Sequence, residues 1–201
     1  VNNIGGKNVP VVIADVSGIE NITPKDFEGI GYSYNEVTDK WNISDAAADY
    51  IFTGNKIIDF LLPGTLKIIC DPITWENAKD KTKYFPLFSS REYLHAGKKS
   101  DRLNFILIDC TPGLTENILE EQLLQNLRQD KTAVLCLYSS SAYSTPVLRK
   151  AFREVAEQHW NNPGRVFCET DLAAADEQLI HFAIETGALL LDGFGDGIFL
   201  E

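Results

Sequence analysis

The sequence predicts an α/β fold of repeated strand–helix units around a parallel sheet, and three observations predict it. Short apolar, β-branched runs recur along the chain, and a helical pattern follows several of them. In the second half, successive strands begin roughly 25 to 40 residues apart. Such near-continuous apolar runs are typical of strands buried on both faces of a parallel sheet. The fold class is therefore α/β with TIM-barrel-like (βα) repeats or, alternatively, an open doubly wound sheet.

The length of the chain restricts the barrel alternative. A complete eight-unit barrel usually takes about 250 residues, whereas this chain has 201. A barrel here is therefore expected to be compact or incomplete. The length and the 44% hydrophobic content suit one domain over residues 1–201.

Six apolar segments are expected to form strands: residues 9–15, 65–71, 103–109, 132–138, 165–169 and 188–192. Residues 49–54 are a further candidate strand. Residues 32–43, within the poorly patterned region 30–64, fit a hairpin or an irregular excursion. Residues 76–101 show a mixed pattern and are left unassigned.

Helices are expected between these strands. Thr23 and the proline after it open a short helix, and residues 118–128 carry an apolar stripe. Thr145 is expected to cap a helix that ends before Asn161. A last helix is expected over residues 172–186, with Gly187 as its end.

Composition excludes several classes of function. The net charge of −11 and the pI of about 4.7 give a surface that repels phosphate backbones, which argues against nucleic-acid binding. The sequence has no apolar stretch of the roughly 20 residues that span a bilayer, and no signal-peptide pattern at its start, so the expected location is the cytoplasm. The chain has no methionine and ends directly after an apolar run, which suggests a segment of a larger chain.

Carboxylates close five of the six expected strands, where ligands bind in both candidate folds. They are Asp15, Asp71, Asp109, Glu169 and Asp192. One interpretation is an acidic ring that binds a hard cation such as Mg²⁺, or a general acid–base pair. The alternative is that these residues cap the helices that follow. The expected strand ends carry no histidine or lysine, which favours capping.

The four cysteines allow two interpretations. Cys70, Cys110, Cys136 and Cys168 lie in or beside four expected strands, so an iron–sulfur cluster is conceivable. Cys70 precedes an aspartate, however, whereas Cys110 follows one. If the two aspartates are equivalent, the two sulfur atoms cannot lie at one level of one wall. Buried, inert thiols are therefore the favoured interpretation.

Other polar motifs are weaker. His95, His159 and His181 lack metal-ligand spacing. Three consecutive serines, residues 139–141, are expected to form a loop. The glycine-rich segment 192–197 could hold a phosphate after a strand, or could form a tight turn, and its aspartates repel anions.

Residues 185–201, ETGALLLDGFGDGIFLE, resemble a specific family. The G-x-L-L-x-D-G-x-G-D-G stretch is similar to the end of the inserted middle domain in the large, three-domain form of 4-hydroxy-3-methylbut-2-enyl diphosphate synthase. The resemblance is specific over the last 30 or so residues. Over the rest of the chain it concerns the order of the strands.

The resemblance implies a parent chain with a catalytic barrel, this inserted barrel-like domain and a C-terminal domain with a 4Fe–4S cluster. The parent enzyme reductively opens methylerythritol cyclodiphosphate in isoprenoid biosynthesis, by the methylerythritol phosphate pathway, with electrons from ferredoxin or flavodoxin. The family's cluster cysteines lie beyond Glu201, so the fragment is expected to hold no cofactor.

Three functions follow as hypotheses. A diphosphate site needs converging basic groups or helix amino termini, whereas the expected strand ends are acidic. The leading hypothesis is therefore a non-catalytic spacer whose partners are the catalytic barrel and the iron–sulfur domain of the same chain. The alternatives are a free-standing Mg²⁺-dependent enzyme that uses Asp71, Asp109 and Glu169, and a regulatory small-molecule module.

Overall fold

Eight parallel strands close into a barrel in the computed structural model, which describes residues 3–112, 121–141, 144–157, 162–168 and 175–200. Around the ring the order is β1, β10, β9, β8, β7, β6, β5 and β4. The strands are β1 (Val11–Asp15), β4 (Tyr50–Phe52), β5 (Lys67–Cys70), β6 (Tyr84–Ser89), β7 (Asn104–Asp109), β8 (Ala133–Tyr138), β9 (Gly164–Cys168) and β10 (Gly197–Leu200). The TIM-barrel-like fold is confirmed, and the barrel is closed rather than incomplete.

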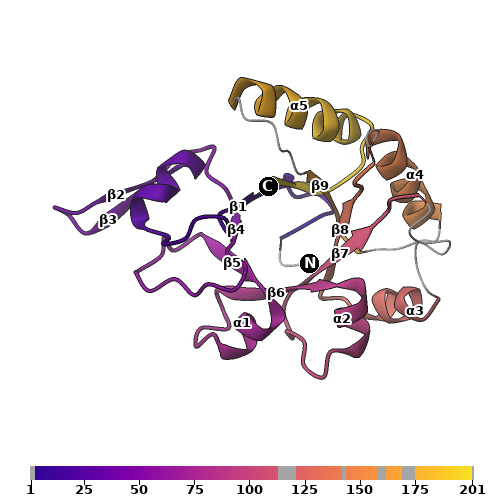
Figure 1. Ribbon diagram of the computed structural model, residues 1–201, viewed down its shortest axis with the longest axis horizontal. Helices are drawn as coiled ribbons and strands as arrows, with labels where there is room; N and C mark the ends of the chain where they lie inside the picture. Colours follow the sequence, from indigo (N-terminus) through magenta and orange to yellow (C-terminus); the bar gives the residue numbers. More distant parts are fainter. Residues whose placement is uncertain (1–2, 113–120, 142–143, 158–161, 169–174, 201) are drawn as a thin grey trace.

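A helix follows each strand from β5 to β9. These helices are α1 (Pro72–Asn77), α2 (Ser90–His95), α3 (Glu121–Gln129), α4 (Ser144–Glu157) and α5 (Ala175–Leu191). Between β1 and β4 the chain instead forms the 3-10 helix η1 (Pro24–Ile30) and an antiparallel hairpin of β2 (Tyr32–Asn35) and β3 (Lys40–Ile43). Figure 1 shows the hairpin projecting from the side of the barrel opposite α4. The short helices, together with η1 and the hairpin in place of full βα units, let a chain of 201 residues close an eight-stranded barrel.

Most of the expected strands are present. The expected segments at residues 9–15, 65–71, 103–109, 132–138 and 165–169 correspond to β1, β5, β7, β8 and β9, and residues 49–54 contain β4. The hairpin alternative for residues 32–43 is confirmed. Helix η1 begins after Thr23 as expected, and the amide and hydroxyl of Thr23 both donate to the Asp26 carboxylate at 2.7 Å. The unassigned region 76–101 contains β6 and α2.

Three expectations at the end of the chain and in α4 are wrong. Residues 188–192 are not a strand, because α5 continues through Gly187 to Leu191, and the last strand is β10. A run of three leucines fits a buried strand or a buried helix turn equally well, and here Leu189 packs as a helix residue in the core. Thr145 lies inside α4 rather than capping it, and its hydroxyl donates to Glu185 at 2.8 Å.

The inside of the barrel is packed mainly with aromatic and aliphatic side chains. Tyr50, Phe85 and Phe105 meet in edge-to-face contacts, with ring centroids 5.6 Å apart for Tyr50 and Phe105. A second group of rings lies nearer the carboxyl ends of the strands. The interior is therefore a packed core and not a channel.

Two further cores lie outside the strands. One joins the outer faces of β7 and β8 to helices α2, α3 and α4. The other places Phe27 of η1, Tyr32 of β2 and Trp75 of α1 against the outer faces of β4 and β5. Phe27 is fully buried there, so η1 and the hairpin cover a part of the wall where a βα barrel ordinarily has a helix.

Candidate functional site

Three of the five carboxylates singled out in the sequence lie at one end of the barrel, at the carboxyl ends of three strands, although β1 and β7 stand on opposite sides of the ring. Asp15 and Asp109 end β1 and β7, and Asp71 directly follows β5. Side chains alternate along a strand, and the residues two positions earlier (Ile13, Leu107 and Ile69) all belong to the interior cluster. Asp15, Asp71 and Asp109 therefore share the inward-facing position at one end of the barrel. Glu169 lies outside the described residues.

Asp192 does not belong to this group. It follows the last residue of α5, which leads into the amino end of β10, so Asp192 lies toward the opposite end of the barrel. Its carboxylate pairs with the guanidinium Nε of Arg149 at 2.6 Å. The expectation that Asp192 closes a strand is wrong, because the segment before it is helical.

The glycine-rich segment 192–197 is a turn from a helix into a strand, not from a strand into a helix. Gly193 and Gly195 have φ values of 79° and 84°, which favour glycine. The carbonyl of Asp196 accepts from the Val11 amide at 3.1 Å, and its carboxylate accepts from the Gly164 amide at 3.0 Å. The turn therefore ties β10 to β1 and β9, and the helix end before it disfavours an anion.

Two of these three carboxylates stabilise local turns. Asp15 Oδ1 accepts from the Ser17 amide at 2.6 Å, and Asp109 Oδ1 accepts from the Thr111 amide at 2.8 Å. Each bond spans two residues, as in an Asx turn. Asp71 stands at the start of α1 and makes no side-chain capping bond there. Partial burial, followed by the charge of Glu92, raises the pKa of the Asp71 carboxyl.

Glu92 is a neighbour of this group that the sequence analysis did not single out. It is the third residue of α2 and accepts from the Ser89 amide at 2.8 Å, while the Glu92 amide donates to the Ser89 hydroxyl at 3.2 Å. This is a capping box, and its S-x-x-E spacing at residues 89–92 is visible in the sequence. The capping box accounts for Glu92 as a residue that stabilises the start of α2.

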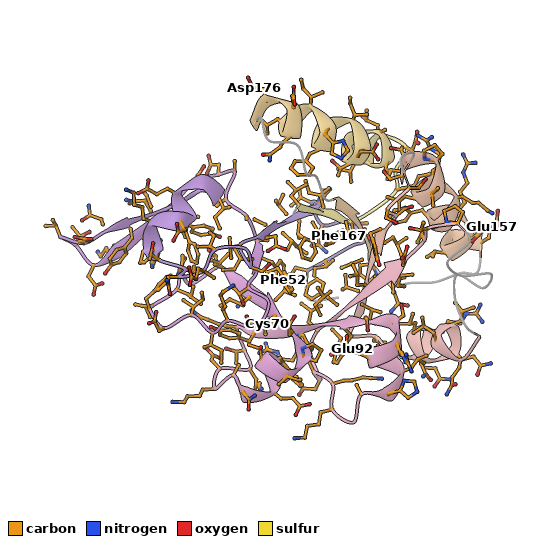
Figure 2. The ribbon with its side chains drawn as sticks, viewed as in Figure 1. Phe52, Cys70, Glu92, Glu157, Phe167 and Asp176 are labelled. Carbon is orange, nitrogen blue, oxygen red and sulfur yellow. The ribbon has the colours of Figure 1, made fainter. Side chains whose placement is uncertain are left out.

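Aromatic rings fill the barrel beneath these carboxylates. The centroid of Phe199 lies 5.7 Å from that of Phe52 and 4.7 Å from that of Phe167, and Tyr138 lies 5.8 Å from Phe167. Figure 2 shows Phe52 and Phe167 near the middle of the ring of strands. A βα-barrel enzyme binds its substrate above such a packed interior, among the loops at the carboxyl ends of the strands. The rings therefore form the floor of the barrel mouth.

The geometry of the acidic group bears on the hypothesis of a cation site. Within the described ranges, no three histidine, cysteine, aspartate or glutamate side chains are placed to hold a metal ion together. Mg²⁺ takes six oxygen ligands in octahedral geometry, usually one or two carboxylates together with several waters. The hydrogen bonds of Asp15 and Asp109 already direct one oxygen of each carboxylate to the backbone.

A surface cavity of about 660 Å³ lies beside the barrel mouth, between the loops after β1 and β4. Its lining is mixed: Glu20, Lys56 and Asp59 contribute charge, and Ile58 and Phe60 contribute apolar surface. The ammonium of Lys56 donates to the Ser17 carbonyl. Asp15, Asp71 and Asp109 do not line this cavity.

The described thiols do not converge. Cys70, Cys110 and Cys136 are buried in three different hydrophobic clusters. Burial, together with the neighbouring aspartates, raises the pKa of both Cys70 and Cys110 to about 12. An iron–sulfur cluster needs several thiolates around one centre, so these three residues do not fit one. The side chain of Cys168 lies outside the described residues.

Comparison with known proteins relates the whole chain to one kind of enzyme. Along 203 aligned residues it is 30% identical to a 4-hydroxy-3-methylbut-2-en-1-yl diphosphate synthase (flavodoxin) of Parabacteroides distasonis. Synthases with the same name from Bacteroides thetaiotaomicron and Phocaeicola vulgatus are 24% and 25% identical over 201 residues. The resemblance to the synthase family is confirmed.

The match covers all of this chain but only 28% of each synthase. The chain thus spans little more than a quarter of the length of the curated relatives it matches. No family model and no solved structure matches it. In the part of the chain that the structure describes, no helix is long and apolar enough to span a membrane.

Proposed function

We propose that residues 1–201 are the inserted, non-catalytic domain of a three-domain 4-hydroxy-3-methylbut-2-en-1-yl diphosphate synthase. The observation that carries the proposal is the full-length match of this chain to 28% of each relative. The parent enzyme is then an oxidoreductase of isoprenoid biosynthesis that receives electrons from flavodoxin, which the relatives' names include, or from ferredoxin. Its substrate is methylerythritol cyclodiphosphate, and its 4Fe–4S cluster lies in another domain.

The chemistry of the barrel mouth supports a non-catalytic role. A diphosphate carries several negative charges and is bound by arginine, lysine or helix amino termini. The mouth instead presents Asp15, Asp71 and Asp109 over a layer of aromatic rings. The carboxylates repel an anionic substrate, and the aromatic rings supply no positive charge to bind it.

A packed domain without chemistry of its own acts through geometry. The reductive step requires substrate and cluster to meet at short range, and small misplacements of reacting groups can lower rates by about a hundredfold. A rigid barrel between the catalytic barrel and the iron–sulfur domain sets the separation and direction of these two parts. Its contribution is therefore to the encounter, not to the bond-breaking step.

Deletion of the domain tests the proposal. Residues 1–201 are removed from the parent and replaced by a short flexible linker. Turnover should fall by about a hundredfold, while cluster absorbance and substrate affinity of the catalytic barrel remain. A control parent with the linker added beside the intact domain should keep most of its turnover. Full activity of the deletion variant would refute the spacer role.

A Mg²⁺-dependent barrel enzyme is the second candidate. The inward position of three carboxylates at one end of the barrel favours it, whereas the lack of a three-ligand group among the described residues argues against it. Such an enzyme should bind the cation itself. Millimolar Mg²⁺ should then raise the melting temperature of the chain, because a ligand that binds only the folded state stabilises it. Asp71→Asn should abolish that rise. The spacer proposal expects no rise in either protein.

A further inference from the structure

The outer wall of the barrel is apolar on β1, β5, β7, β8 and β10, but these sectors are covered unequally. On β7 and β8 the outward side chains are at most 2% exposed, because α2, α3 and α4 pack over them: Ile106, Ile108, Leu135 and Leu137. On β5 the outward Ile68 and Cys70 are fully buried under α1, η1 and the hairpin. In these sectors the outward side chains of the strands are fully covered.

The sector at β10 and β1 is different. Val11, Ile13 and Phe199 point into the barrel core, so their neighbours along the strands point outward. The outward residues are Val12, Ala14, Ile198 and Leu200, and all four are partly exposed. They form an apolar strip on two adjacent, hydrogen-bonded strands. The described residues thus leave this part of the wall incompletely covered.

Helix α5 borders this strip and has an apolar face of its own. It packs on β9 and α4, and β10 is the next strand round the ring. Leu179, Ile180, Ile184 and Leu191 are exposed by 66%, 60%, 61% and 91%. Positions 180, 184 and 191 share one side of a helix. Figure 1 shows α5 along the edge of the barrel, with no helix drawn between it and the η1–hairpin unit.

Charged side chains do not break up the α5 face. Between Glu177 and Asp192 the helix carries a single carboxylate, Glu185. Glu185 is turned toward α4, where the hydroxyls of Ser144 and Thr145 donate to it. The exposed side of α5 is therefore apolar over several turns, with Asp176 and Glu177 at its start. Contiguous apolar surface of this kind marks an interaction site.

We propose that the α5–β10–β1 face is the docking surface for an amphipathic helix from the rest of the parent polypeptide. The face consists of Ile180, Ile184 and Leu191 together with Val12, Ala14, Ile198 and Leu200. The inference rests on the proposed function, because it takes this chain as one domain of a longer protein. It adds the surface through which this domain contacts the rest of the parent polypeptide.

Two observations select this occupant. The outward residues of β5, β7 and β8 are covered by helices or by the η1–hairpin unit. The strip on β10 and β1 lacks such a cover among the described residues, so a further helix would complete the wall there. Nearly three quarters of each relative lies outside the matched region, which supplies the polypeptide. The docked helix should present leucine, isoleucine or valine to the face and basic residues to Asp176 and Glu177.

Cysteine labelling in the full-length parent tests the proposal. Ile184→Cys places a thiol on the face, and Ile73→Cys places one on α1, where the isoleucine is 77% exposed. Without cover, the two sites should react with a maleimide at similar rates. We expect Ile184→Cys to react at least tenfold more slowly in the native protein and equally fast in denaturant. Ile180→Cys repeats the measurement if Ile184→Cys disturbs folding. Equal native rates would overturn the proposal.

A photo-crosslinking residue in place of Ile184 identifies the occupant. The proposal requires an intramolecular product with a peptide from outside residues 1–201. A crosslinked dimer, or protection that weakens on dilution, would show that a second copy covers the face and would overturn it. The deletion experiment for the spacer role is read separately, so slow turnover without labelling protection would refute only the docking face.

Discussion

The mouth of the barrel and its outer wall at α5, β10 and β1 differ in how many of their side chains are packed or hydrogen-bonded by the described residues. At the mouth, two aspartates are bonded to turn amides, a capping box organises the start of α2, and four aromatic rings fill the space below. At the wall, isoleucine and leucine side chains face solvent. Enzymes of this fold usually show the reverse, with an open mouth and a closed wall. The difference favours a domain that works through its outer surface.

Phe199 and Ile198, neighbours on β10, give the largest expected contrast. Phe199 is fully buried among the rings of the interior, whereas Ile198 points outward and is partly exposed. Phe199→Ala should lower the free energy of unfolding of the 201-residue chain by about 3–5 kcal/mol, because a large cavity remains.

Ile198→Ala should cost the same chain less than about 1 kcal/mol, because little buried surface is lost. Urea denaturation of both variants measures the contrast. In the full-length parent, the cost of Ile198→Ala should rise if a helix covers the wall. Equal costs for the two substitutions in the 201-residue chain would break the comparison.

The same wall explains where the sequence was misleading. Strands β1, β5, β7, β8 and β9 were predictable because they are unbroken apolar runs with turn residues after them. Helix α5 was only partly predicted, because its exposed side is apolar and its end shows no helical alternation of polar and apolar residues. The sequence therefore suggested that Gly187 ends the helix and that the leucines at 189–191 belong to a strand.

The remaining misses have different causes. Strand β6 contains Pro86, which argues against a central strand in a sequence, yet Pro86 is buried in the barrel wall and pairs with Cys70. Strand β10 has four residues, too few to show a period. The position of Asp15, Asp71 and Asp109 at one end of the barrel was predictable from strand ends, whereas the aromatic rings beneath them depend on closure of the barrel.

The buried thiols give the next largest effect. A pKa of about 12 leaves Cys70 and Cys110 with roughly a thousandth of the thiolate of an ordinary cysteine near pH 8. Both should react with a disulfide reagent at least about a hundredfold more slowly in the native chain than in denaturant. Site-resolved mass spectrometry measures this. Anaerobic iron and sulfide should yield no stable brown species, and a chromophore lost on Cys→Ser substitution would contradict the account.

Two aspartates should show small effects of opposite sign. Burial and Glu92 raise the pKa of Asp71, so its ionised form is less favourable in the folded chain than in the unfolded one. Its contribution to stability therefore falls as the pH rises through the raised pKa. Asp71→Asn should stabilise the chain at pH 7 by less than about 1 kcal/mol, with no gain below about pH 4.

Asp80 is the matched comparison for Asp71. Hydrogen bonds from Thr82 lower the pKa of Asp80, so its ionised form stabilises the fold above the unfolded pKa and loses that effect in acid. Asp80→Asn should therefore destabilise the chain at pH 7. Thermal melts at pH 7 and pH 3.5 distinguish the two variants. A loss of stability in Asp71→Asn at pH 7 would contradict the unfavourable charge at the mouth.

Turnover of the full-length parent with Asp15, Asp71 and Asp109 all replaced by asparagine tests most directly whether the barrel mouth takes part in chemistry. Asparagine keeps an oxygen that accepts from the amides of Ser17 and Thr111, so the turns should persist and the melting temperature should change little. The account predicts turnover and substrate affinity within about twofold of the unaltered enzyme, which is less than 1 kcal/mol in activation free energy. A tenfold or greater loss of turnover in a folded variant with an unchanged melting temperature would contradict it.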